Sequence, residues 1–255
     1  MATGTVIDIE NGVGISISSD QIDLLAGSGQ SVMFETDTVS VSFDAAAIDY
    51  IDAAAGSDDV ELTIVRVGPS NLSEENRQLI GDRPVYDFNL TAGETAISDF
   101  GGGTATIVIP YTLQSGEDPN AVVVYYIDGS GSLFPVTGRY DAETGTVEFT
   151  AERFAVYVAG YNYVNFSDVG DTAWYYDAVT YIAAREITTG PGDGLFSPDY
   201  TLTRGQFIVM LMRTYGIEED ENSTDCRKRT VLRPCRISPM RTKYRITPRK
   251  RWNPL

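Results

Sequence analysis

The residues best suited to bind a ligand lie at the start of an expected helix that ends near Gly216. Thr203 and Gln206 have the spacing of a capping box, in which two side chains satisfy free backbone amides at a helix N-terminus. Arg204 then falls in the first turn, where the remaining free amides and the helix dipole favour an anion. Its planar guanidinium can hold a carboxylate with two hydrogen bonds. Arg204 is therefore the first candidate binding residue, and a structural ion pair with an acidic neighbour is the alternative.

Missing residue types exclude most catalytic machinery from residues 1–221. The 255-residue sequence has no histidine, and all its lysines and both its cysteines lie after residue 222. A Ser–His or Cys–His nucleophile pair, a Schiff-base lysine and a thiolate metal site are therefore impossible before that point. Cys226 and Cys235 lack the second pair that a zinc site needs. We expect no metal, no cofactor and no catalytic residue. Paired carboxylates stay open, because the sequence gives no way to choose two of 36 acidic residues.

Charge divides the chain sharply. Residues 1–221 contain 35 acidic and 8 basic residues, whereas residues 222–255 contain 11 basic residues and one aspartate. The acidic part argues against nucleic-acid binding, which depends on clustered Lys and Arg. No apolar run approaches the roughly 20 residues of a membrane-spanning helix, so no membrane partner is expected. Residues 1–14 lack the basic start and apolar run of a signal peptide, and we expect any export signal to lie outside this sequence.

Periodicity predicts a mainly β chain with some helix, in which residues 1–160 form a β-rich, sandwich-like ectodomain. Alternating apolar residues and turn signals predict strands at 6–9, 14–18, 31–35, 39–43, 60–67, 85–90, 104–110, 121–127, 132–136, 146–149 and 154–159. Helices are expected at 20–25 and 44–54, with Asp44 as an N-cap, and one or two helical turns at 73–80. Asp128-Gly129 and Thr144-Gly145 mark hairpin turns. Two sub-lobes, 1–67 and 84–160, are an alternative to a single domain.

Helical periodicity replaces the strand pattern in residues 161–221. Residues 172–185 place apolar side chains on one helical face, and a loop rich in Gly and Pro precedes the helix that Thr203 caps. Two helices in a unit of about 55 residues can bury little surface alone. We therefore expect this unit to need copies of itself or a neighbour.

Several separated motifs lie in this helical unit: Phe166-Ser167-Asp168-Val169, Trp174-Tyr175-Tyr176-Asp177-Ala178-Val179, Gly190, Gly192-Asp193-Gly194, Phe196-Ser197-Pro198 and Leu202-Thr203-Arg204-Gly205-Gln206-Phe207. In this order and spacing they resemble the S-layer homology module of bacterial cell-surface proteins. The resemblance covers about a fifth of the chain. Gly205 and Gln206 stand where the family more commonly has alanine and glutamate, and one module is visible where three are typical.

The resemblance implies a non-enzymatic protein of the cell wall or S-layer, held outside the cell by non-covalent binding to secondary cell-wall polysaccharide. This polymer often carries a pyruvate ketal in the family. The implied binding residues are Arg204, Trp174, Asp168, Gly190, Gly194 and Gln206. Family modules usually assemble in threes, so self-association of the lone module is a further expectation. The competing hypotheses are a carbohydrate-active enzyme with the module as its targeting appendage, and an oligomerising structural spacer.

Each candidate also has a structural interpretation. Trp174 could be a core aromatic, because aromatic residues dominate small cores. Asp168 could cap or order the first helix, and Gln206 could serve in capping alone. Gly190 and Gly194 are then simple turn residues.

The composition of residues 222–255 differs from that of the rest of the chain, because this segment contains 11 basic residues and four prolines. This composition predicts a disordered basic tail, and a basic arm for an anionic polymer is a second interpretation. Translation in a shifted frame is a third. Codons for Cys226-Arg227-Lys228, read one base later, can encode Ala-Gly-Asn, a stretch typical of the start of another module. An uninterrupted parent gene with the same tail would refute the frameshift.

Overall fold

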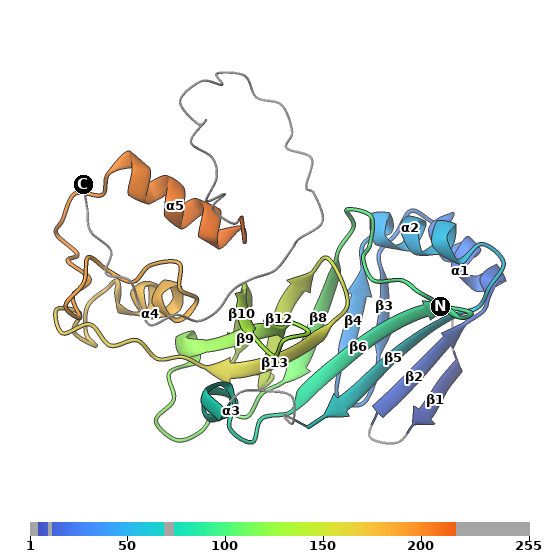
Figure 1. The fold of residues 1–255 in the computed structure, drawn as a ribbon, viewed down its shortest axis with the longest axis horizontal. Coiled ribbons are helices and arrows are strands. Elements are labelled where there is room, and N and C mark those ends of the chain that lie inside the picture. Colours follow the sequence, from blue (N-terminus) through green and yellow to red (C-terminus); the bar gives the residue numbers. More distant parts are fainter. Residues whose placement is uncertain (1–4, 10–11, 69–73, 218–255) are drawn as a thin grey trace.

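The computed structural model describes residues 5–9, 12–68 and 74–217, and most of them belong to two antiparallel β-sheets (Figure 1). The larger sheet contains β1 (Thr5–Ile9), β2 (Gly12–Ile17), β5 (Val60–Val67), β6 (Val85–Ala92), β7 (Thr95–Ala96), β9 (Val122–Ile127), β10 (Leu133–Val136) and β13 (Val156–Tyr161). The smaller sheet contains β3 (Val32–Glu35), β4 (Ser40–Phe43), β8 (Ala105–Pro110), β11 (Gly138–Asp141) and β12 (Thr146–Ala151). The strand orders are β1-β2-β5-β6-β13-β9-β10, with β7 beside β6, and β11-β12-β8-β4-β3. The predicted β-rich architecture is confirmed.

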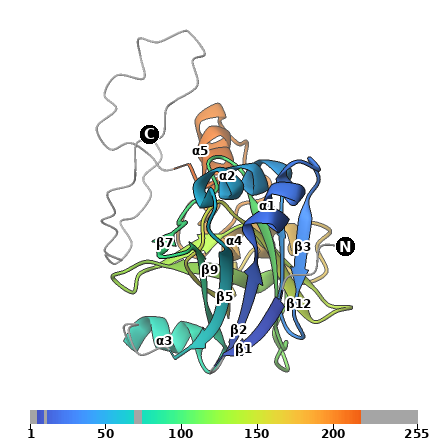
Figure 2. The same cartoon turned by 90° about the vertical axis from the view of Figure 1, so that its right-hand side faces the viewer.

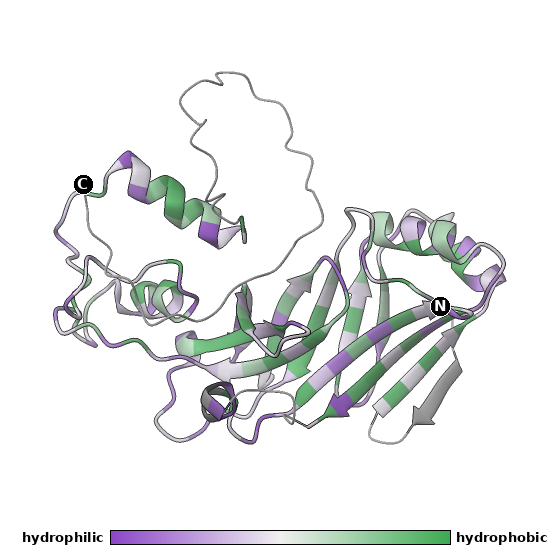
Figure 3. Cartoon of the chain, viewed as in Figure 1, coloured by the Kyte–Doolittle hydropathy of each residue, from purple (hydrophilic) through white to green (hydrophobic). Residues whose placement is uncertain are grey.

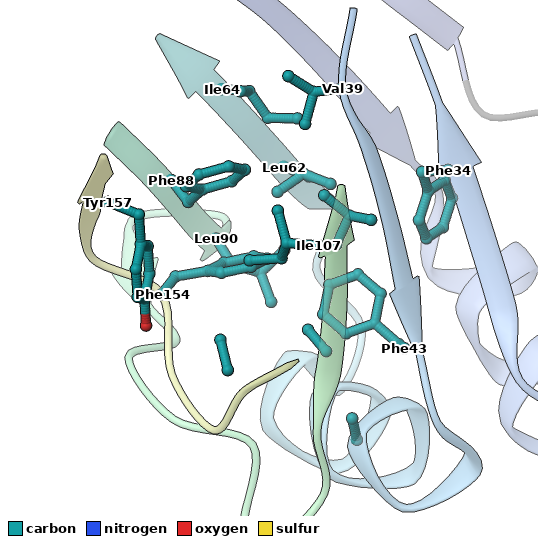
Figure 4. Close-up of a cluster of buried hydrophobic side chains, with 14 of the residues drawn as sticks. Phe34, Val39, Phe43, Leu62, Ile64, Phe88, Leu90, Ile107, Phe154 and Tyr157 are labelled. Carbon is teal, nitrogen blue, oxygen red and sulfur yellow. The ribbon is translucent and has the colours of Figure 1, made fainter. Parts of the chain in front are cut away.

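Alternating side chains build the core between the sheets. Along β5, Val60, Leu62 and Ile64 are buried, and polar residues separate them, as the alternating colours of the strands show (Figure 3). Aromatic rings fill the centre, where Phe43 and Phe154 lie at 5.6 Å between ring centroids in an edge-on arrangement (Figure 4). Edge-on pairs are the geometry that the quadrupoles of aromatic rings favour.

Each sheet combines strands from residues 1–67 with strands from residues 84–160. In the larger sheet Leu62 of β5 lies opposite Leu90 of β6, and in the smaller sheet Val41 of β4 lies opposite Ile107 of β8. One continuous cluster of buried residues extends from residue 15 to residue 159. Residues 1–67 and 84–160 both contribute to this cluster.

Two helices cover one end of the strands, α1 (Ser19–Ala26) and α2 (Ala45–Ala55) (Figures 1 and 2). Both place isoleucines in the core, Ile22 from α1 and Ile48 from α2. Asp44 caps α2 as predicted, because its carboxylate accepts a hydrogen bond from the amide of Ala47 at 2.8 Å. The same carboxylate accepts two bonds from Thr104. Burial raises the pKa of Asp44, but these hydrogen bonds outweigh it and lower the pKa overall.

Elements outside the sandwich core complete the β region. Helix α3 (Glu74–Ile80) lies against the larger sheet, where Ile80 is buried with Val85 and Val158. A short 3-10 helix, η2 (Pro119–Ala121), precedes β9. The alternation of apolar residues in the sequence did not predict β7 or β11. At the Asp128 turn, the glycine with positive φ is Gly131 at 81°, not Gly129.

Two helices follow the sandwich, α4 (Tyr176–Ala184) and α5 (Arg204–Thr214). Helix α4 begins four residues later than the predicted range 172–185. The preceding residues form tight turns instead, in which Ala173 bonds to Gly170 and Tyr176 bonds to Ala173 through the backbone. Within the described residues, no helix is long and apolar enough to cross a membrane. The predictions for residues 222–255, the disordered tail and the shifted frame, concern positions outside the described residues.

Candidate ligand-binding site

Helix α5 presents Arg204 at an open N-terminus. Thr203 is the N-cap, and it forms the predicted capping box with Gln206: the Thr203 amide donates to Gln206 Oε1 at 2.8 Å, and the Gln206 amide donates to Thr203 Oγ1 at 3.3 Å. Arg204 and Gly205 take the first two helical positions and are exposed. Amides at these positions have no carbonyl partner within a helix. Among the described residues, no carboxylate forms an ion pair with Arg204. Arg204 and Gly205 are therefore both accessible at the N-terminus of α5.

Trp174 lies on the surface, and its interpretation as a core residue is wrong. It is 93% exposed, and its recorded ring contact is an edge-on one with Tyr175, at 5.4 Å between centroids. Helix α4 has Tyr175 as its N-cap, so Trp174 lies before the helix and not on its packed face. The flat face of the indole is thus free to meet a ligand or a partner.

Asp168 organises a loop and does not cap α4. Its carboxylate accepts hydrogen bonds from the amides of Phe196 at 2.8 Å and Ser197 at 2.7 Å. The bond from Phe196 is the largest of the influences that lower the pKa of Asp168. Asp168 therefore holds together two segments that are 28 residues apart in the sequence.

The two candidate glycines belong to the same loop. Gly190 has a φ of 67°, and a Cβ atom there would lie 2.0 Å from the carbonyl oxygen of Leu195, so a larger residue cannot fit. Gly194 has a φ of 72°, and its carbonyl accepts a hydrogen bond from the amide of Ser167. Both residues shape the turn through the backbone.

The structure brings together three of the six candidates. Asp168, Gly190 and Gly194 form one hydrogen-bonded loop, closed by the contact of Phe166 with Phe196. In the part of the chain that the structure describes, no recorded hydrogen bond or ring contact links Trp174 or Arg204 to this loop. The six residues thus form three separate features on one module: the loop, the exposed indole, and the N-terminus of α5.

Sequence reasoning missed Arg185, which fixes α4 to the sandwich. Arg185 is 5% exposed, and its guanidinium donates to the carbonyls of Gly138, Asn120 and Val122, with Nη2 to Val122 at 2.8 Å. It also donates to the backbone carbonyl of Tyr181, and its central carbon lies 3.5 Å from the centroid of the Tyr181 ring. All five N–H groups of the guanidinium are used. The sequence feature that could have identified Arg185 is its place at the end of an apolar helix, where the helix dipole favours a cation.

Burial lowers the pKa of Arg185, and the neighbouring tyrosines Tyr181 and Tyr125 oppose this effect. Among the described residues, Arg185 has no ion-pair partner. Its charge is therefore stabilised by carbonyl dipoles and an aromatic face. This residue is a structural link between α4 and the sandwich.

Known proteins share parts of this chain. Residues 165–208 match the family model described as the S-layer homology domain. An amylopullulanase from Thermoanaerobacterium thermosulfurigenes is 25% identical over 213 residues, 82% of this chain and 11% of the relative. An endo-1,4-beta-xylanase A from Thermoanaerobacterium saccharolyticum is 29% identical over 120 residues, 46% of this chain and 10% of the relative.

A third relative is a surface-layer 125 kDa protein from Lysinibacillus sphaericus, 28% identical over 107 residues, 42% of this chain and 9% of that protein. The chain thus spans about a tenth of the length of these curated relatives. A match of 213 residues is much longer than the helical unit, so it must include part of the sandwich. The motifs, the two helices α4 and α5 and the family match agree, and residues 165–208 are the part of this chain that matches the S-layer homology domain.

Proposed function

We propose that the S-layer homology domain holds this protein outside a bacterial cell by binding a secondary cell-wall polysaccharide non-covalently. S-layer homology domains generally bind cell-wall polymers, and one relative is named as a surface-layer protein. The observation that carries the proposal is the exposed Arg204 at the open N-terminus of α5. In this proposal the chain consists of an ectodomain, residues 1–160, and an anchoring module, residues 161–221.

The ligand group that Arg204 fits best is a carboxylate, such as that of a pyruvate ketal on a sugar. A planar guanidinium can grip a carboxylate with two hydrogen bonds, and the free amides of α5 add to the attraction. The formal net charge of the chain is −17, so an anionic polymer is repelled at long range. Binding then depends on short-range contacts, and the exposed face of Trp174 offers one to a sugar ring.

We assign no catalytic step to residues 1–160 and propose that they act as a spacer or interaction module. A second candidate function is a segment of a carbohydrate-active enzyme, with the module as its targeting appendage. The observation in its favour is the match of 82% of this chain to part of an amylopullulanase.

Retention on purified cell-wall polymer, with and without its ketal, tests the anchoring role. Wild type should bind the ketal-bearing polymer, and Arg204→Ala should reduce binding about tenfold or more, because a two-bond contact to a charged group is lost. Arg213→Ala, which removes one positive charge from the last turn of the same helix, is the matched control and should bind as wild type does.

Equal retention of wild type and Arg204→Ala would remove Arg204 from the site. Binding that does not change when the ketal is removed would show that the polymer is recognised through neutral sugars. Hydrolysis of the polymer during the assay would favour the enzyme candidate.

A further inference from the structure

A cleft lies at the end of the sandwich that α1 and α2 leave uncovered. β2 and β4 lead into these helices and β5 leaves them, so the start of β2, the β3–β4 turn and the end of β5 meet at the opposite end. The cleft has a volume of about 730 Å³ and is lined by Gly12, Val13, residues 35–39, Ile64, Arg66 and Tyr86. Ligand sites in proteins commonly measure roughly 300–1,000 Å³.

The cleft borders the apolar core of the sandwich, to which Val39, Ile64 and Tyr86 belong. Val39 and Ile64 lie side by side at the end of the core that is remote from Phe43 (Figure 4). Arg66 and Tyr86 are direct neighbours on β5 and β6, and the guanidinium carbon lies 5.7 Å from the centre of the tyrosine ring. An apolar surface with a few fixed polar groups is typical of a small-molecule site.

Tyr86 carries a buried polar group that the fold does not use. The residue is 1% exposed, and its hydroxyl has no hydrogen-bond partner among the described residues. Buried polar groups in native proteins are nearly always paired. Because Tyr86 is among the residues that line the cleft, a ligand bound there could supply the partner that this hydroxyl lacks.

The rim of the cleft combines acceptors with a donor. Glu35 and Asp37 are exposed on the β3–β4 turn, and Arg66 faces the same cleft. Thr36 stiffens the turn, since its hydroxyl accepts from the amide of Val39 at 3.0 Å and donates to the Val39 carbonyl at 2.8 Å. The carboxylates repel a simple anion and the guanidinium repels a simple cation. A neutral molecule whose groups both donate and accept hydrogen bonds suits this rim.

We propose that this cleft binds a short segment of neutral glycan. Sugar hydroxyls can donate to Glu35 and Asp37 and accept from Arg66, and a sugar hydroxyl that reaches Tyr86 would give its hydroxyl a partner. A neutral glycan is not repelled by the negative charge of the chain. This site is on the sandwich and is independent of the anchoring role proposed for the S-layer homology domain.

Calorimetric titration of the full chain with neutral hexasaccharides tests the proposal, using α-1,4-linked glucose, β-1,4-linked glucose and β-1,4-linked xylose as probes. At least one probe should bind saturably below about 10 mM. Tyr86→Phe should weaken that binding about three- to tenfold, the loss expected for one hydrogen bond. Arg66→Leu should weaken it about tenfold or more, because a charged donor is removed.

Matched variants separate binding from folding. Tyr86→Phe should keep or raise the midpoint of thermal unfolding, because the hydroxyl has no partner to lose. Tyr50→Phe, which alters an exposed tyrosine on α2, should bind as wild type does. Arg204→Ala should leave hexasaccharide binding unchanged, so the failure of one site is distinguishable from that of the other.

Three outcomes would overturn the proposal. The first is no saturable binding of any hexasaccharide up to about 10 mM. The second is binding of inorganic phosphate or the zwitterion glycine betaine in place of the sugars. The third is equal sugar affinity of wild type, Tyr86→Phe and Arg66→Leu.

Discussion

Asp168 gives the irregular loop of the S-layer homology domain its shape. Its carboxylate accepts the amides of Phe196 and Ser197, and Ser197 has a positive φ of 60°, a conformation that needs support from its surroundings. Sequence reasoning identified Asp168 as a candidate. It could not identify the partner amides, because they lie far along the chain and outside any periodic pattern.

We expect Asp168 to make stability depend on pH in the acid range. Its pKa in the folded protein lies below the ordinary value of 3.8, so its contribution is fully present above that pH and is lost as the pH falls through the lowered pKa. Asp168→Asn should therefore have a lower midpoint of thermal unfolding at neutral pH. The midpoints of wild type and variant should converge as the solution is acidified.

Scanning calorimetry from neutral pH to about pH 2 measures this effect, because the range spans the pKa of an ordinary carboxyl group. Asp171→Asn, at an exposed position in the same loop region, should follow wild type throughout. A constant difference between wild type and Asp168→Asn at every pH would contradict the assignment.

At the scale of elements, local patterns predicted most strands but not how they pair. Range 60–67 coincides with β5, because apolar alternation is a local property of the sequence. The pairing of β4 with β8 joins residues far apart, and the sequence alone gives no register for it. The exposure of Trp174 was unpredictable for a similar reason. It depends on where α4 begins, and tertiary contacts decide that position as much as helix propensity does.

Arg185 is the residue on which the position of α4 depends most. Arg185→Met should lower the free energy of unfolding by about 3 kcal/mol, since it removes the guanidinium donors to the buried carbonyls of Gly138, Asn120 and Val122. Arg185→Lys should cost less, because one ammonium group can still reach some of these carbonyls. Denaturant unfolding followed by tyrosine fluorescence measures both.

Arg185 and the exposed Arg139 both line a cavity of about 210 Å³. The control is therefore Arg139→Met, which should change stability little. Equal effects of Arg185→Met and Arg139→Met would show that the buried bonds do not stabilise the docked helix.

At the scale of the whole molecule, α5 differs from α1, α2 and α4, each of which contributes buried residues. None of its residues is buried, and its hydrophobic band is exposed, with Phe207 at 55%, Ile208 at 54% and Leu211 at 44% (Figure 3). The recorded hydrogen bond from the sandwich to α5 runs from the Thr137 hydroxyl to the Thr214 carbonyl. An exposed apolar surface of this kind is typical of an interface.

We expect a second copy of the chain to cover this band. Sedimentation velocity at increasing concentration should show wild type associating and Phe207→Asp remaining a monomer, because a buried charge opposes the interface. Leu24→Asp changes a leucine on α1 that is 74% exposed, and it should associate as wild type does. A wild type that stays monomeric at every concentration would contradict self-association through α5.

The hydrogen bonds of Arg185 to the sandwich also determine how a mechanical force would pass through the protein. If α5 grips a wall polymer, a pull on it reaches α4 through the loop that Asp168 braces. It then enters the sandwich at η2, β9 and β11, where the guanidinium binds the Asn120, Val122 and Gly138 carbonyls. Four guanidinium bonds to these carbonyls would resist that force together, so the loop between α4 and α5 would unravel before the sandwich opened.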